Sequence, residues 1–195
     1  MSKTTITRKD IMDITEYGKT RKTHRAQIMK MKKNRRLHCG PYATFYFENF
    51  DTMWYQVHEM LFIEKGGEEQ IKDELDAYNP LIPNGEELVS TLMFEIANPE
   101  LRAKFLDGLG GIEDSTFFNI DGMVVKGVPE ADADRTNAEG KASSVQFLHF
   151  PFTPDQVTAF KRPNARVELS IEHSKYAHTS LLPEISRKVL EIDFT

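Results

Sequence analysis

The stretch Glu87–Ile96 constrains the fold more than any other, because it alternates between two faces that are both mainly apolar. Leu92 and Phe94 belong to one face, whereas Val89 and Met93 belong to the other. A strand that is apolar on both faces is predicted to lie at the centre of a sheet, with protein on each side of it. The rest of the chain therefore has to supply the elements that flank and cover this strand.

Those elements are a mixture of short strands and helices. Alternation and turn residues predict strands at 36–39, 43–48, 116–120, 123–126, 144–150 and 166–173. Helical spacing and caps predict helices at 21–34, 52–65, 68–78, 98–109 and 182–194, with Gly18 interrupting the first helical stretch. Because the order is mixed, we expect an α+β fold: a mainly antiparallel sheet with helices packed on one face and a basic N-terminal helix.

Length and composition predict a single domain over residues 1–195. It would begin with a basic helical segment, 1–36, and contain a mobile acidic loop at 129–142. No apolar run approaches the roughly 18 residues that span a bilayer, and the first ten residues lack the apolar core of a secretory signal. The single cysteine, Cys39, cannot form an intramolecular disulfide or hold an iron–sulfur cluster alone. These features predict a cytoplasmic protein with no membrane partner.

The net charge of −5 conceals an asymmetry along the chain. Residues 1–50 carry 12 Lys and Arg against 4 Asp and Glu, whereas residues 51–195 carry 13 against 26. The basic run has no acid in it, and its candidate partner-binding residues are Arg21, Lys22, Arg25, Lys30, Lys32, Lys33, Arg35 and Arg36. It is either a solvated helix face, a surface that docks on acidic residues of this fold, a second copy or a partner, or a nucleic-acid footprint. The absence of aromatic residues for base stacking disfavours nucleic acid.

A second candidate region consists of carboxylates at positions expected to be buried. The candidate ligand or metal-binding residues are Glu59, Glu64, Glu74 and Glu95, with Gln56 and Tyr78 as orienting groups. If Gly66-Gly67 turns the chain, Glu64 and Glu74 are expected to approach each other across two antiparallel helices. Clustered carboxylates suit a divalent cation or an acid–base pair, and no other cofactor is evident. The alternative is that each carboxylate accepts hydrogen bonds and holds a junction together.

Familiar catalytic motifs are absent from the sequence. His58-Glu59 begins like the helix of a zinc protease, but Phe62 stands where the second histidine is needed. There is no phosphate-binding glycine loop and no nucleophile elbow, so whether the chain is an enzyme stays open. Cys39 is interpreted as a buried, inert thiol. A further polar cluster without a specific signature comprises Ser143, Ser144, Gln146, His149, His173 and Tyr176.

Several segments resemble one family of bacterial proteins of about this length, known only as a domain of unknown function. They are Phe47-Glu-Asn49, Gln56-x-x-Glu-Met60, Glu74-Leu-Asp-x-Tyr-Asn-Pro-Leu-Ile-Pro83, Glu87-Leu-x-x-Thr-Leu-Met-x-Glu95, Ser143-Ser-Val-Gln-Phe-Leu148 and Ile171-x-His-x-x-Tyr176. The resemblance covers nearly the whole chain. It implies genes that neighbour those of rubrerythrin-like and iron–sulfur oxidoreductase proteins, and therefore a redox or peroxide-stress setting in which the electron chemistry belongs to a partner.

Three functions remain in competition. The first, slightly preferred, is a non-catalytic accessory protein that binds a redox partner through its basic helix and its acidic face. The second is a protein, including an enzyme, that binds a metal or small ligand through the carboxylate region. The third is nucleic-acid binding through the basic run.

Overall fold

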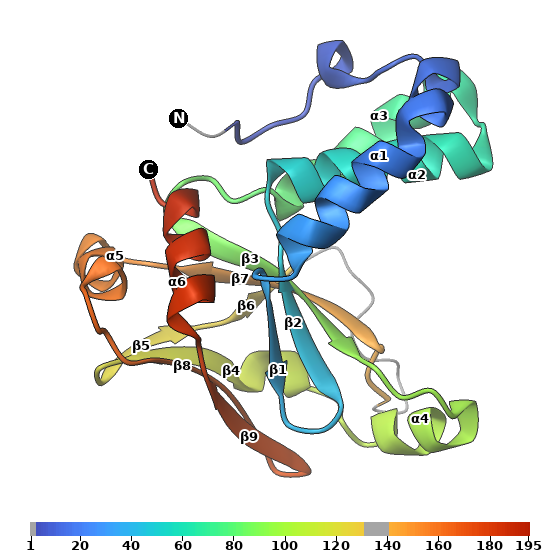
Figure 1. Cartoon of the computed structure of the whole chain (residues 1–195). Coiled ribbons are helices and arrows are strands. Elements are labelled where there is room, and N and C mark those ends of the chain that lie inside the picture. Colours follow the sequence, from blue (N-terminus) through green and yellow to red (C-terminus); the bar gives the residue numbers. More distant parts are fainter. Residues whose placement is uncertain (1–2, 131–140) are drawn as a thin grey trace.

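The computed structural model describes residues 3–130 and 141–195, which form two antiparallel sheets with helices around them (Figure 1). The larger sheet has the strand order β1-β2-β3-β7-β6, and the smaller sheet has the order β5-β4-β8-β9. The larger sheet consists of β1 (Arg36–Cys39), β2 (Ala43–Phe47), β3 (Glu87–Phe94), β6 (Val128–Pro129) and β7 (Val145–Pro151). The smaller sheet consists of β4 (Thr116–Ile120), β5 (Met123–Lys126), β8 (Val167–His173) and β9 (Tyr176–Leu181).

Helices lie on several sides of the sheets (Figure 1). The α-helices of the described residues are α1 (Ile14–Lys32), α2 (Phe50–Glu64), α3 (Gly67–Tyr78), α4 (Pro99–Leu106), α5 (Pro154–Lys161) and α6 (Glu184–Leu190). Short 3-10 helices occupy Arg8–Asp10, Asn79–Leu81, Ile112–Ser115 and Glu191–Asp193. The α+β class is confirmed, but the strands are divided between two sheets. Helices α1 to α3 gather on one side of the molecule, whereas α5 and α6 flank the opposite side, so the helices are not confined to one face.

The main hydrophobic core fills the space between the two sheets. Phe45 and Phe150 of the larger sheet are fully buried in it, as are Phe118 and Leu169 of the smaller sheet. The rings of Phe118 and Phe150 lie 4.9 Å apart between their centroids in an edge-to-face arrangement. Aromatic pairs of this kind add to the stabilisation that burial alone gives.

A second core lies on the other face of the larger sheet, under the helices. Val57 and Leu61 of α2 and Ile71 of α3 pack there with Val89 of β3. Leu92, also in β3, belongs to the core between the sheets. The prediction of a central strand with two apolar faces is therefore confirmed, and β3 connects the two cores.

Helix α1 shows where local interpretation of the sequence was wrong. The helix starts at Ile14, capped by the Asp13 carboxylate, and continues through Gly18 to Lys32. A Cβ atom at Gly18 would lie 2.9 Å from the Phe62 ring on α2, closer than carbon atoms normally approach. Gly18 is therefore the position at which α1 and α2 pack closely. Glycine destabilises the interior of a helix, but a larger side chain would collide with Phe62 here.

Other elements predicted from the sequence agree more closely with the structure. The β4–β5 hairpin turns at Asp121-Gly122, both with positive φ, as the sequence predicts. The C-terminal helix is shorter than the expected 182–194, because α6 ends at Leu190 and continues as the 3-10 helix Glu191–Asp193. Strand β9, which ends at Leu181, was not predicted. Most of the predicted acidic loop, residues 131–140, lies outside the described residues.

Candidate functional site

The outer face of α1 is rich in Lys and Arg side chains. Only Tyr17 and Ile28 of this 19-residue helix are buried. At helical spacing, Lys22, Arg25 and Lys33 fall on one stripe together with Met29, whose side chain is 61% exposed. We call the four residues Lys22, Arg25, Met29 and Lys33 the α1 stripe.

Two of the predicted partner-binding cations face inward instead. The Arg21 guanidinium donates two hydrogen bonds to the Glu59 carboxylate, at 2.8 and 2.7 Å. The same carboxylate accepts a 2.7 Å hydrogen bond from the buried Tyr17 hydroxyl. Arg21 is the main cause of the lowered pKa of Glu59, with the Tyr17 hydrogen bond assisting. Glu59 thus joins α1 to α2, and Arg21 is unavailable to a partner in this arrangement.

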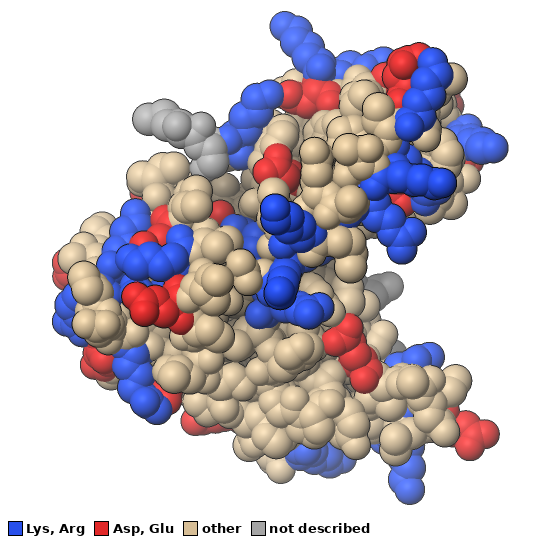
Figure 2. Space-filling model, viewed as in Figure 1, with Lys and Arg blue, Asp and Glu red and all other residues tan. Residues whose placement is uncertain are grey.

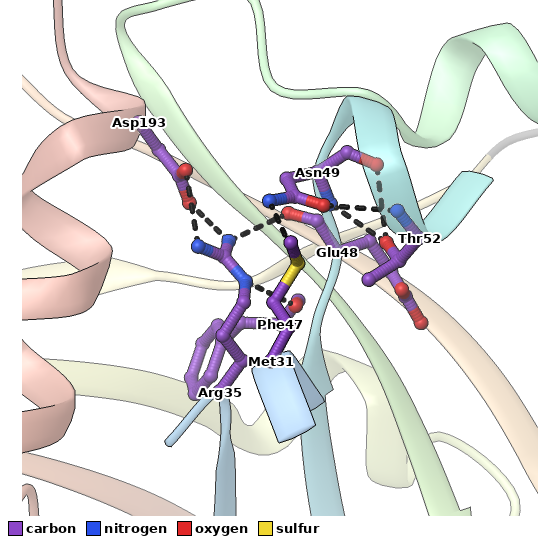
Figure 3. A network of polar contacts seen from close by, with 7 residues as sticks. All are labelled: Met31, Arg35, Phe47, Glu48, Asn49, Thr52 and Asp193. Carbon is purple, nitrogen blue, oxygen red and sulfur yellow. Dashed lines mark hydrogen bonds and ion pairs between the residues drawn. The ribbon is translucent and has the colours of Figure 1, made fainter. Parts of the chain in front are cut away.

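Arg35 is the second inward-facing cation. It is 3% exposed and donates to the backbone carbonyl oxygens of Phe47 and Glu48, both at 2.9 Å (Figure 3). Its guanidinium also forms a buried ion pair with Asp193, which follows α6. A buried arginine satisfied in this way holds parts of a fold together. The candidate assignment of Arg35 to a partner surface is therefore corrected.

The remaining candidate cations form no ion pair within the described residues. They are Lys22, Arg25, Lys30, Lys32, Lys33 and Arg36. Figure 2 shows Lys and Arg side chains gathered over α1 and near the place where it leads into β1. Like charges at helical spacing repel one another, so this surface is electrostatically unfavourable until an anion approaches it.

The α2–α3 hairpin brings two of the four candidate carboxylates together. The Gln70 side-chain amide donates 2.8 Å hydrogen bonds to both Glu64 and Glu74. Nearby, the Gln56 amide approaches the Tyr78 hydroxyl at 3.4 Å. Burial and the two carboxylates raise the pKa of Tyr78. The expected approach of Glu64 and Glu74 is therefore seen, with a neutral amide between them.

The other two carboxylates lie elsewhere. Glu59 faces α1, as described above, and Glu95 follows β3, where it accepts hydrogen bonds from Thr44 at 2.6 Å and Tyr46 at 2.8 Å. Burial and the bond to Glu95 raise the pKa of Tyr46 to about 12. Of the four carboxylates Glu74 alone is buried, whereas Glu64, at the end of a helix, and Glu95, just beyond a strand end, are exposed. Among the described residues, no three His, Cys, Asp or Glu side chains form a group able to hold a metal ion.

His149 lies between two carboxylates that the sequence did not connect with it. Its Nδ1 lies 3.0 Å from Glu87 and its Nε2 lies 2.9 Å from Glu130. The two ring nitrogens point in opposite directions, so the two carboxylates bind opposite sides of the imidazole and do not converge on one point. We call this arrangement of Glu87, His149 and Glu130 the clasp. The hydrogen bond to Glu87 is the main cause of the raised pKa of His149. Both carboxylates thereby favour the doubly protonated ring.

The rest of the predicted polar cluster has local structural contacts. The Tyr176 hydroxyl accepts hydrogen bonds from the backbone N–H groups of Tyr42 and Ala43, each at 3.1 Å, and donates to the carbonyl of Cys39 at 2.7 Å. Ser143 accepts from the N–H of Val145. The Ser144 carbonyl accepts from the N–H of Phe94. The Gln146 side-chain amide donates to the carbonyl of Ser143, and Nδ1 of His173 accepts from the N–H of Lys175.

Cys39 is buried, as expected. Its burial raises the pKa of the thiol, which disfavours the reactive thiolate. The described residues include no helix with the length and apolar character needed to span a bilayer.

Glu48 is a candidate that sequence reasoning did not single out. Its side chain is buried just after β2, and one carboxylate oxygen accepts a 2.8 Å hydrogen bond from Thr91. The other oxygen is buried and has no hydrogen-bond partner. The signal was present in the sequence, because the alternation of β2 places Glu48 on the same face as Thr44 and Tyr46.

Comparisons with known proteins agree with this fold and identify no activity. Residues 5–194 match a family whose description reads "Protein of unknown function (DUF3501)". A crystal structure of a novel protein of unknown function from Burkholderia pseudomallei is 32% identical, with a TM-score of 0.90. The similarity covers 98% of this chain and 100% of that one. No curated protein matches the chain.

Proposed function

We propose a docking role for this chain, which belongs to the DUF3501 family of proteins of unknown function. In this proposal it is a non-catalytic accessory protein that binds an acidic partner protein on the outer face of α1. The observation that carries the proposal is the α1 stripe, in which three cations that form no ion pair with any described residue surround an exposed methionine.

The composition of the stripe supports a protein partner. An apolar side chain within a ring of charges resembles the core-and-rim arrangement of protein interfaces. The charges would steer an acidic surface toward α1, and Met29 would be desolvated on contact. A nucleic-acid surface typically adds aromatic residues or grooves for bases, and the stripe contains no aromatic residue.

The partner class follows from the family resemblance and from Cys39. The resemblance implies a redox setting, so we take the partner to be a redox protein with an acidic surface. Cys39 is buried with a raised pKa, which argues against thiol redox chemistry on this chain. The accessory protein would then position or protect a partner that performs the electron transfer.

The first prediction concerns the stripe itself. The triple variant Lys22→Glu/Arg25→Glu/Lys33→Glu is expected to weaken partner binding by roughly tenfold or more, because it removes three exposed ion pairs of about 0.2–1 kcal/mol each and replaces them with repulsion between like charges. A partner captured with the tagged protein at about 50 mM salt is to be identified, purified and titrated. Its Kd should rise steeply toward about 500 mM salt as the charges are screened.

A matched control removes the same charge elsewhere. Lys104→Glu/Lys126→Glu/Lys175→Glu changes three exposed cations outside α1 and is expected to keep the affinity of the wild-type protein. Equal losses in both variants would show that only net charge matters and would overturn the proposal. Capture that disappears after nuclease treatment would overturn it in favour of nucleic acid.

A further inference from the structure

We propose that the face of the larger sheet turned away from the smaller sheet holds a binding site for a small alkylammonium cation, at the margin of the core under the helices. The site is built from the Glu48 carboxylate and the aromatic rings of Tyr46 and Phe147. It is separate from the α1 stripe and does not depend on the docking role proposed above.

Glu48 supplies the unsatisfied group. Its side chain is 3% exposed, and Thr91 is its single side-chain hydrogen-bond partner in the described structure. Figure 3 shows the carboxylate directed away from Arg35, which donates to the backbone carbonyl of Glu48 instead. A buried carboxylate oxygen without a donor is costly, and it leaves the chain with a place for a positively charged N–H group.

The strand register places two aromatic residues beside this carboxylate. Thr91 of β3 lies opposite Tyr46 on β2 and opposite Phe147 on β7. Neighbouring strands are about 4.8 Å apart, so the two aromatic residues rise from backbones roughly 10 Å apart with one small side chain between them. Glu48 follows Tyr46 by two residues and therefore shares its face. The result is a row in which the small Thr91 side chain lies between the Tyr46 and Phe147 rings, and the Glu48 carboxylate lies beside this row, hydrogen-bonded to Thr91.

This combination of groups matches a cation better than any other ligand. The face of an aromatic ring attracts ammonium groups, and recognition of alkylammonium ligands by several rings is a known use of this attraction. A carboxylate adds a charge-assisted hydrogen bond to an N–H donor. Beyond Tyr46, Arg36 lies across β1, where Glu95 offsets its charge. Anionic ligands would meet the uncompensated Glu48 and be repelled.

Access to the site requires a side chain to move. Thr91 is only 4% exposed, whereas Tyr46 and Phe147 are half-buried. The Tyr46 ring is held by its hydrogen bond to Glu95. Phe147 packs against the core under the helices, so the Tyr46 ring, which that one exposed hydrogen bond restrains, is the side chain that moves. Ring rotations of this kind are fast compared with ligand binding.

The test uses n-butylammonium as the probe, with n-butanol and butyrate as neutral and anionic analogues. Calorimetric titration of the full chain should show saturable binding of n-butylammonium alone. Glu48→Gln keeps the shape and removes the charge, so its Kd should rise about tenfold or more, the equivalent of about 1.4 kcal/mol. Its thermal midpoint without ligand should stay unchanged or rise, because a buried charge has been removed.

Two further variants separate the site from general effects. Tyr46→Leu should weaken n-butylammonium binding because the aromatic face is lost, whereas Glu100→Gln changes an exposed carboxylate on α4, away from the site, and should keep the affinity. Binding of all three probes alike, or of none, would overturn the proposal. So would a clear fall in the thermal midpoint of Glu48→Gln, because that result would give Glu48 a structural role.

Discussion

At the scale of single residues, the clasp around His149 makes the stability of the protein depend on pH. Glu87 and Glu130 raise the pKa of His149, so the folded state favours the charged imidazolium. This stabilisation is fully present below the unfolded pKa of about 6.5 and is lost as pH rises through the folded value. We expect His149→Gln to lower the free energy of unfolding by about 1–3 kcal/mol near pH 5.5 and by much less near pH 9. Urea unfolding across this range measures the difference.

Two variants check that the effect belongs to the clasp. Glu87→Gln should remove most of the pH dependence, since the bond to Glu87 is the main cause of the raised pKa. His173→Gln replaces a histidine that accepts one backbone N–H and should leave the pH profile unchanged. A profile in His149→Gln parallel to that of the wild-type protein would contradict the clasp.

At the scale of elements, the Tyr176 hydroxyl holds the β1–β2 hairpin to β9 through three backbone hydrogen bonds. Tyr176→Phe leaves these backbone groups of Cys39, Tyr42 and Ala43 without that partner. We expect a loss of about 2–4 kcal/mol in the free energy of unfolding, since each buried unsatisfied group costs about 1–3 kcal/mol. Denaturant titration measures it. Tyr42→Phe, whose hydroxyl has no hydrogen bond among the described contacts, is the matched control, and equal losses would contradict the role of Tyr176.

The helices and strands also show how much of this fold could be predicted from the sequence. The centre of the larger sheet was predictable because β3 carries its two apolar faces within eight residues. Gly18 was misinterpreted because local propensity contains no information about Phe62, the residue that needs the space. Glu59 was identified as special, but its role depends on Arg21, which lies 38 residues away. Periodicity reports which side of an element faces inward, whereas the partners on that side come from segments that only the fold brings together.

At the scale of the whole molecule, the two cores are expected to unfold together, because β3 contributes Val89 to one and Leu92 to the other. The chain contains a natural probe for each core. Trp54, the single tryptophan, packs against the core under the helices, and Cys39, the single cysteine, lies in the core between the sheets. Trp54 fluorescence and the reactivity of Cys39 toward a thiol reagent should give the same urea midpoint.

The variant Val89→Ala tests this coupling. It should lower both midpoints equally, because it removes packing from the strand that the two cores share, at a cost of about 1–3 kcal/mol. Fluorescence that changes at lower urea than thiol labelling would show that the helical side opens by itself and would contradict cooperative unfolding.

The pair between Arg35 and Asp193 sets an order of events during protein synthesis. Asp193 follows Arg35 by 158 positions, so the ribosome makes the guanidinium long before its counter-charge exists. Until then, enclosing Arg35 would bury an uncompensated charge, which is strongly unfavourable. The nascent chain can form its helices early, but the native closure around Arg35 has to wait until translation has passed Asp193. Chaperones that bind emerging chains would therefore meet this protein with Arg35 not yet enclosed.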